Sequence, residues 1–255
     1  MAGRAQADHL AARIEAELRR LADPERAEGA KRYLKSALEF IGVATPEFRR
    51  ALRSALKAGP PLDRATLLAA ATRLWARPVF ELRAAAVELL DTRAALLLPE
   101  DAALVERLIR EARTWALVDT LAAHTAGSLA ERFPELSATL DRWARDPDFW
   151  VRRAAMLALL GPLRRGGGDF ERFARYADAM LGEKEFFIRK AIGWVLREVS
   201  KKRPELVASF LAPRMSRASG VTLREALKYL PPEDRRRLLS AHSASAGRTR
   251  RPGNG

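Results

Sequence analysis

A motif that recurs about every 35 residues constrains the fold more than any other feature of this sequence. Three segments share an aromatic residue, two variable residues, a basic residue and an alanine: Phe80-Glu81-Leu82-Arg83-Ala84, Trp150-Val151-Arg152-Arg153-Ala154 and Phe187-Ile188-Arg189-Lys190-Ala191. Trp115 lies midway between the first two segments and Val221 continues the series, so the steps are 35, 35, 37 and 34 residues. Such a period is typical of helix pairs that bury their apolar faces by stacking on neighbouring repeats.

The apolar pattern between these motifs is helical. Apolar residues recur three and four positions apart, as in Leu10, Ile14 and Leu18, and we find no convincing strand alternation. The pattern predicts helices over residues 5–22, 24–38, 46–58, 64–75, 78–92, 100–110, 114–131, 134–145, 148–160, 169–181, 186–202, 204–212, 220–229 and 232–240. The ankyrin and tetratricopeptide signatures are missing. The sequence therefore predicts an all-α, HEAT-like helical repeat solenoid (an α-α superhelix), curved, with a basic concave face.

Two segments interrupt the helical pattern. Arg164-Arg165-Gly166-Gly167-Gly168 reads as a flexible basic linker that either reaches a phosphate backbone or simply connects two helices. Residues 243–255 have little apolar content and carry Arg248, Arg250 and Arg251. We expect a single repeat domain over 1–242 and a disordered basic tail over 243–255.

The charge balance favours an anionic partner. Among the 255 residues, 46 Lys and Arg face 32 Asp and Glu, which gives a net charge of +14. Such an excess favours a polyanion such as DNA, because cations that neutralise phosphates release condensed counterions. The alternative is an ordinary solvated basic surface.

Composition also narrows the chemistry. The chain has no cysteine, which excludes disulfides, thiolate nucleophiles and cysteine-ligated metal sites. The histidines His9, His124 and His242 are scattered, and no nucleotide-binding loop or metalloprotease motif is present. We expect no metal ion and no cofactor, and we expect His124, in an apolar helix, to be packed or hydrogen-bonded.

No segment resembles a secretory signal or a membrane span. Residues 1–10 lack an apolar signal-peptide core, and the longest apolar run, 154–160, is far shorter than the roughly 20 residues that span a bilayer. We expect a cytoplasmic protein, associated with the nucleoid through DNA, and a monomer.

Aromatic and acidic residues on the repeat helices are the candidates for chemistry. Trp115 and Asp119 are four residues apart and share one helix face, as do Trp150 and Arg153 at a spacing of three. An aspartate in an otherwise apolar stretch is explained either by function or by a buried salt bridge to an arginine of the next repeat. Trp194 aligns with apolar positions of other repeats, so spacing alone favours a core role for it.

Four segments together carry a family resemblance. They are YLKSALEFIGVATP at 33–46, WALVD at 115–119, FWVRRAA at 149–155 and EFFIRKAIGWVLRE at 185–198. In this order and spacing, over roughly residues 25–230, they resemble the motifs of the AlkD-type DNA alkylation repair glycosylases. Residue 116 is an alanine, where close members of that family carry a second bulky aromatic.

The resemblance implies a HEAT-like repeat fold that excises cationic N3- and N7-alkylated purines from duplex DNA without extruding the base into a pocket. It implies that Trp115, Asp119 and Trp194 face the lesion, that Arg153 holds the nearby DNA backbone, and that Tyr33 adds a contact. The other candidate DNA-binding residues are Trp150, Lys35, Arg152, Phe187, Arg189 and Lys190.

The required chemistry fits these residues. A cationic purine is already a good leaving group, so a carboxylate such as Asp119 need only stabilise the developing oxocarbenium ion and orient water. Indole faces from Trp115 and Trp194 add cation–π attraction of roughly 0.5–2 kcal/mol per contact. The competing hypothesis is a HEAT-like protein that binds damaged or branched DNA without cleaving a glycosidic bond.

Overall fold

The computed structural model describes the backbone of residues 2–248 and the side chains of residues 3–240. Within that range the elements are helices, with one isolated β-bridge between Glu39 and Val79. The prediction of an all-α, helical repeat fold is confirmed. The chain forms two compact units, Met1–Leu129 and Ala130–Gly255, and each is described by itself.

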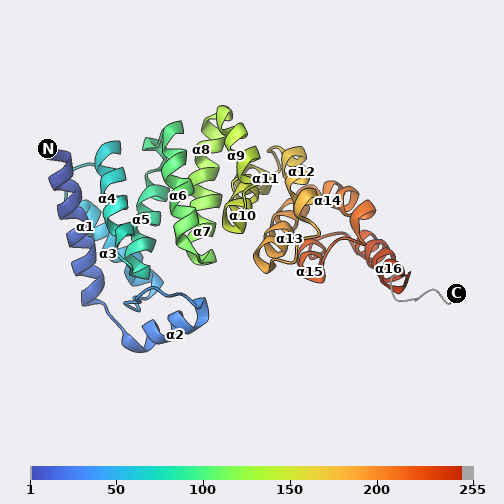
Figure 1. The fold of residues 1–255 in the computed structure, drawn as a ribbon, viewed down its shortest axis with the longest axis horizontal. Coiled ribbons are helices and arrows are strands. Elements are labelled where there is room, and N and C mark those ends of the chain that lie inside the picture. Colours follow the sequence, from blue (N-terminus) through green and yellow to red (C-terminus); the bar gives the residue numbers. More distant parts are fainter. Residues whose placement is uncertain (1, 249–255) are drawn as a thin grey trace. The chain divides into compact units, whose positions relative to one another are not determined.

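The first unit is a stack of helices with one outlier (Figure 1). Its α-helices are α1 (Ala2–Arg20), α2 (Pro24–Leu34), α3 (Thr45–Lys57), α4 (Arg64–Ala76), α5 (Phe80–Thr92), α6 (Ala102–Ala112) and α7 (Trp115–Thr120). A π-helical turn, Leu121–Ala126, continues α7 into α8 (Gly127–Arg132), which crosses the boundary between the units. Helix α1 packs on α3 and α4, α4 packs on α5, and α5 packs on α7.

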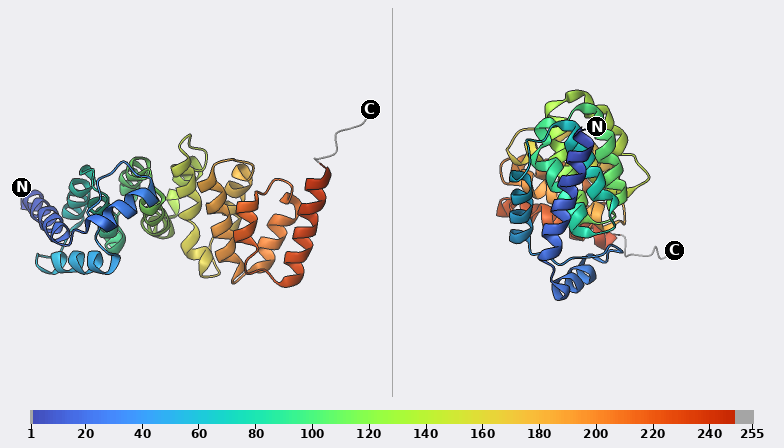
Figure 2. Two further views of the ribbon diagram at one scale, coloured as in Figure 1. Left: turned by 90° about the horizontal axis from the view of Figure 1, so that it is seen from below. Right: turned by 90° about the vertical axis from the view of Figure 1, so that its left-hand side faces the viewer.

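The second unit continues with helices ranged side by side (Figure 2). They are α9 (Ser137–Trp143), α10 (Phe149–Leu157), α11 (Leu160–Arg164), α12 (Phe170–Met180), α13 (Phe186–Ser200), α14 (Pro204–Leu211), α15 (Gly220–Ala226) and α16 (Pro232–Arg248). Helix α13 is central, because it packs on α10, α11, α14 and α15. Gly193 makes its contact with α15 possible, since a Cβ there would lie 2.8 Å from the Thr222 carbonyl oxygen.

Hydrogen bonds between neighbouring repeats follow the sequence period. The Trp75 indole donates to Glu111 at 2.7 Å, the Tyr176 hydroxyl donates to Asp141 at 2.5 Å, and the Arg214 guanidinium donates to Asp178 at 2.9 Å. Each bond joins residues 35 or 36 positions apart. The period seen in the sequence is therefore the distance along the chain between stacked repeats.

The basic residue of the repeat motif also joins one repeat to the next. Arg83 donates to the backbone carbonyl of Glu111 at 3.2 Å, Arg153 donates to the carbonyl of Phe187, and Lys190 pairs with Glu225. Arg83 also lies over the Trp75 ring, 4.9 Å from its centroid, and burial lowers the pKa of this guanidinium. The motif thus places a cation where it joins one repeat to the next.

Several boundaries differ from the prediction, and α2 ends at Leu34 rather than at residue 38 because Lys35 has a left-handed backbone conformation. The segment expected to be a flexible linker is an ordered turn, in which the amides of Gly166 and Gly167 donate to Leu163 and Pro162. Arg164 pairs with Glu198 and Arg165 pairs with Glu131, so both cations are engaged and the connecting interpretation is favoured. Helix α16 extends to Arg248 rather than ending at 240, and residues 249–255 of the expected tail lie outside the described residues. Whether residues 1–242 act as a single domain stays a prediction.

Helix α2 stands apart from this packing. None of its residues is buried, yet the segment that contains it is held by hydrogen bonds where it leaves the stack of helices and where it returns. The amide of Asp23 donates to the Ile41 carbonyl at 3.0 Å, and the Glu81 carboxylate accepts from the amides of Ile41 and Gly42 at 2.9 and 2.7 Å. Gly42 has a φ of +88°, and a Cβ there would lie 2.0 Å from the Asp23 carbonyl oxygen. The 23–42 segment is therefore a closed excursion held at its base.

We predict that Glu81→Gln destabilises the first unit. An amide offers one acceptor oxygen where two backbone N–H groups need one each, and Glu81 is only 5% exposed. Leaving such a donor unsatisfied costs about 1–3 kcal/mol of unfolding free energy. Urea denaturation measures the loss. The matched control is Glu88→Gln, two turns along α5, and an equal effect of both variants would contradict the role of Glu81.

Candidate nucleic-acid interface

Helix α7 carries two of the predicted lesion-facing residues. Trp115 opens the helix and Asp119 lies one turn further on, and both side chains are partly exposed. The Tyr33 ring meets the Trp115 ring edge-on, with centroids 6.1 Å apart and planes at 87°. Tyr33 itself is 74% exposed. The structure therefore brings Tyr33 and Trp115 together on an open surface, with Asp119 on the same helix.

The repeat that holds Asp119 departs from the motif. Asp119 occupies the position at which other repeats have Ala84, Ala154 and Ala191, the last two fully buried. The basic position that links repeats elsewhere is Val118 here, which is buried. Packing explains an alanine and a cation at these positions, and the carboxylate of Asp119 departs from that pattern. The departure is thus a signal for function that sequence comparison between the repeats could have found.

A π-helical turn begins two residues after Asp119. It spans Leu121–Ala126 and buries the Thr125 side chain, whose hydroxyl has no hydrogen-bond partner among the described residues. Such widened turns within α-helices are frequent at functional sites. His124, within this turn, contacts Asp91 through Nδ1 at 2.9 Å, which confirms that it is hydrogen-bonded. No sequence pattern predicted the π turn.

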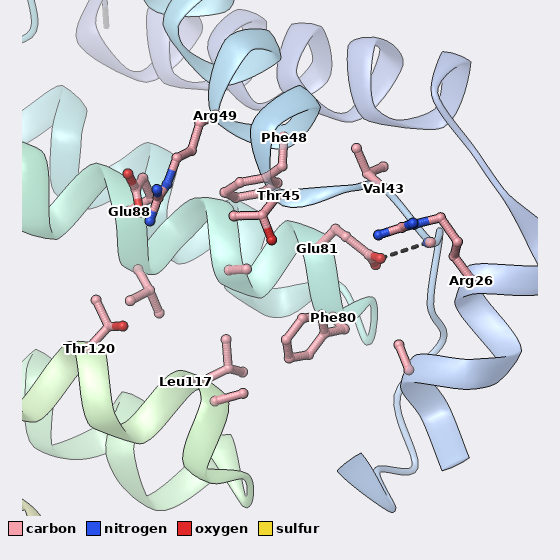
Figure 3. Close-up of a pocket in the computed structure, with 15 residues that line it drawn as sticks. Arg26, Val43, Thr45, Phe48, Arg49, Phe80, Glu81, Glu88, Leu117 and Thr120 are labelled. Atoms are coloured by element: carbon pink, nitrogen blue, oxygen red, sulfur yellow. Dashed lines mark hydrogen bonds between the residues drawn. The ribbon is translucent and has the colours of Figure 1, made fainter. Parts of the chain in front are cut away.

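A pocket of about 380 Å³ opens on the other face of α7 (Figure 3). Phe48, Phe80 and Leu117 line it, and Ala116 and Thr120 form its wall on α7. Helix α2 contributes Arg26 and Ala30, which precede Tyr33 at helical spacing. Ala116 thus lines an open space at the position where a bulky aromatic is found in the family that the sequence resembles. The pocket adjoins the Tyr33–Trp115 pair because the same two helices carry both.

In the second unit, Trp150 and Phe187 form an aromatic cluster with Phe149. The Trp150 centroid is 4.6 Å from that of Phe149 and 4.8 Å from that of Phe187. Arg153 is 2% exposed, and its guanidinium lies 5.9 Å from the Phe187 centroid. Trp150 is 7% exposed, so this candidate is largely part of the core.

Trp194, on α13, is partly exposed although its neighbours Gly193 and Val195 are buried. Trp194 is therefore not fully buried, although repeat spacing alone favoured a core role for it. Part of its side chain is exposed to solvent, and the resemblance to the repair family requires such exposure of a residue that faces a lesion.

The remaining basic candidates differ in how far they are engaged. Arg152 pairs with Glu183 at 2.8 Å and donates to the carbonyls of Asp146 and Pro147. Arg189 donates to the Glu183 carbonyl at 2.6 Å. Lys35, by contrast, is exposed and has no hydrogen bond or ion pair with the described residues. Arg152 and Arg189 thus serve packing within their unit, whereas Lys35 is available to a ligand.

Known proteins place the chain in a family. The family model described as DNA alkylation repair enzyme matches residues 14–230. The chain belongs to the DNA alkylation repair enzyme family. A comparison with curated protein sequences found no match.

Solved structures share the fold. A predicted DNA alkylation repair enzyme from Enterococcus faecalis aligns with a TM-score of 0.75 and 23% identity, over 83% of this chain and 97% of its own. AlkD2 from Streptococcus mutans gives 0.57 and 19%, over 72% and 90%. The protein smu.31 from Streptococcus mutans UA159 gives 0.56 and 18%, over 73% and 92%. Among the described residues, no helix has the length and apolar character to cross a membrane, and no cluster of potential ligands could hold a metal ion.

The ion pair between Lys190 and Glu225 should make the unfolding free energy depend on pH. Hydrogen bonding from Lys190, assisted by Arg197, lowers the pKa of Glu225 below its usual value. A carboxyl whose pKa is lowered by folding stabilises the protein above its unfolded pKa of about 4.3, and loses this contribution as the pH falls through the folded pKa. Glu225→Gln should therefore lower the unfolding free energy at pH 7, and the gap to the wild type should close in acid.

Urea denaturation at pH 7 and at pH 3 measures this gap. Glu205→Gln, at an exposed position of α14, is the control. A gap that is the same at both pH values would show that the ion pair does not stabilise the repeats.

Proposed function

We propose that this repair-family member is a DNA glycosylase that excises cationic N3- and N7-alkylated purines, such as 3-methyladenine and 7-methylguanine, from duplex DNA. The observation that carries the proposal is the Trp115–Asp119 face of α7, where a carboxylate replaces the alanine of the repeat beside an exposed aromatic pair. The net charge of +14 supports a polyanionic substrate.

The roles of these residues follow from the chemistry of the bond. An alkylated purine leaves with its electron pair and becomes neutral, so no general acid has to protonate it. Positive charge develops on the deoxyribose, and Asp119 stabilises this charge and orients the water that attacks the anomeric carbon. The proton lost by that water passes to the carboxylate or to solvent. We propose that the exposed part of Trp115 adds cation–π attraction to this sugar, and that Trp194, which is also partly exposed, offers an indole face to the DNA as the resemblance implies.

The backbone contacts follow from exposure and charge. We assign Tyr33 and Lys35 to the DNA backbone, because both are exposed and Tyr33 contacts Trp115. Arg153 is only 2% exposed and donates to the Phe187 carbonyl, so we propose that it positions the helix that meets the DNA backbone. The proposed mechanism grips the duplex and attacks the sugar from the groove, so the base need not enter a pocket.

We predict that Asp119→Asn abolishes release of 7-methylguanine from a duplex that contains one such base. The amide keeps the size of the side chain but cannot stabilise a cation, so affinity for the duplex should change less than twofold. Single-turnover release of free base, with enzyme in excess, measures the effect.

The matched control is Asp91→Asn, which removes the carboxylate that contacts His124 on the neighbouring helix and should leave release intact. If the wild-type protein binds the duplex but releases base no faster than buffer, the proposal fails. The chain would then be a DNA-binding protein without glycosylase activity.

A further inference from the structure

Two residues other than glycine have a left-handed backbone conformation in the described part of the chain. Lys35 ends α2 with φ 49° and ψ 40°, and Arg113 ends α6 with φ 49° and ψ 21°. Helices often end on a residue in this conformation, but it is usually glycine, because a Cβ is disfavoured there. At both positions this chain carries a long cationic side chain instead.

Both cations lie close in sequence to the same aromatic pair. Lys35 follows Tyr33 by two residues and Arg113 precedes Trp115 by two, and the two rings are in edge contact. Both side chains are exposed, and neither has a hydrogen bond or an ion pair with another described residue. In this they differ from Arg83, whose guanidinium joins two repeats.

The backbone on either side of Arg113 is firmly held. The Glu111 carbonyl accepts from Arg83, and its carboxylate accepts from the Trp75 indole at 2.7 Å. Ala112 and Thr114 are each only 3% exposed. Arg113 is thus a solvent-facing position between two buried ones, and its conformation is imposed by its neighbours. Glycine would satisfy that backbone without strain, so packing gives no reason for an arginine.

We propose that Arg113 is a DNA-phosphate contact, and that with Lys35 it places one cation on each side of the Tyr33–Trp115 pair. A guanidinium suits this role because its planar set of donors binds two phosphate oxygens at once. Two cations near an exposed aromatic pair would set the register of the backbone relative to α7. The inference rests on the proposed function only in taking DNA as the partner.

The test is Arg113→Gly, measured by thermal unfolding and by duplex binding across a salt series. Glycine relieves the left-handed strain, so the Tm should rise by about 2–4 °C. Loss of one phosphate contact should reduce the slope of log K against log salt by about 0.9. Arg113→Lys should retain the slope, and Arg113→Asn, which tolerates the same backbone, should lose it as glycine does.

The control is Arg107→Gln, which removes an exposed cation from the body of α6, where no hydrogen bond or ion pair to a described residue holds it. Its slope should stay close to that of the wild type. An unchanged slope in Arg113→Gly, or a duplex affinity of the wild type that does not depend on salt, would overturn the inference. Because the readout is binding, a reduced slope without any base release would support this contact and refute the glycosylase proposal separately.

Discussion

The cation that reaches from one repeat to the next is the interaction on which the rest of this structure depends. Arg83 and Arg153 each donate to a carbonyl of the following repeat, and Lys190 pairs with Glu225 there. Because Arg153 is buried and Arg83 and Lys190 are partly buried, an unmatched partner would cost more than a surface ion pair contributes. The bonds therefore fix the register of neighbouring helices as well as adding stability.

The candidate site can be recognised because its repeat lacks the cation that links the other repeats. In the repeat that contains α7, the linking cation is replaced by Val118 and the packed alanine by Asp119. The same region contains a π-helical turn and a left-handed arginine. Helix α2, held only at its base, then brings Tyr33 to Trp115. The helix stack of the first unit thus contains one irregular region, and several departures from the repeat pattern occur there.

Much of the fold followed from the sequence, and the exceptions have physical causes. The 35-residue period and the apolar spacing predicted nearly every helix, because stacked helix pairs impose both patterns on the chain. The ordered turn at 164–168 was missed because its ion pairs and the bond from Arg203 to the Gly167 carbonyl join it to residues that are distant in sequence. Local composition also could not reveal that Arg152 is engaged by Glu183 whereas Lys35 is exposed without such a partner. Spacing did place Trp115 and Asp119 on one helix, but the contact with Tyr33 depends on the excursion that Glu81 and Gly42 close.

If the protein stabilises a cationic sugar rather than protonating the base, as we propose, the charge of the leaving base decides which purines it releases. Two duplexes that differ at one position, with 7-methylguanine in one and neutral hypoxanthine in the other, should be treated with the wild-type protein at equal concentration. We expect release of 7-methylguanine alone, because a neutral purine is a poor leaving group unless it is protonated. Release of hypoxanthine at a comparable rate would contradict this expectation.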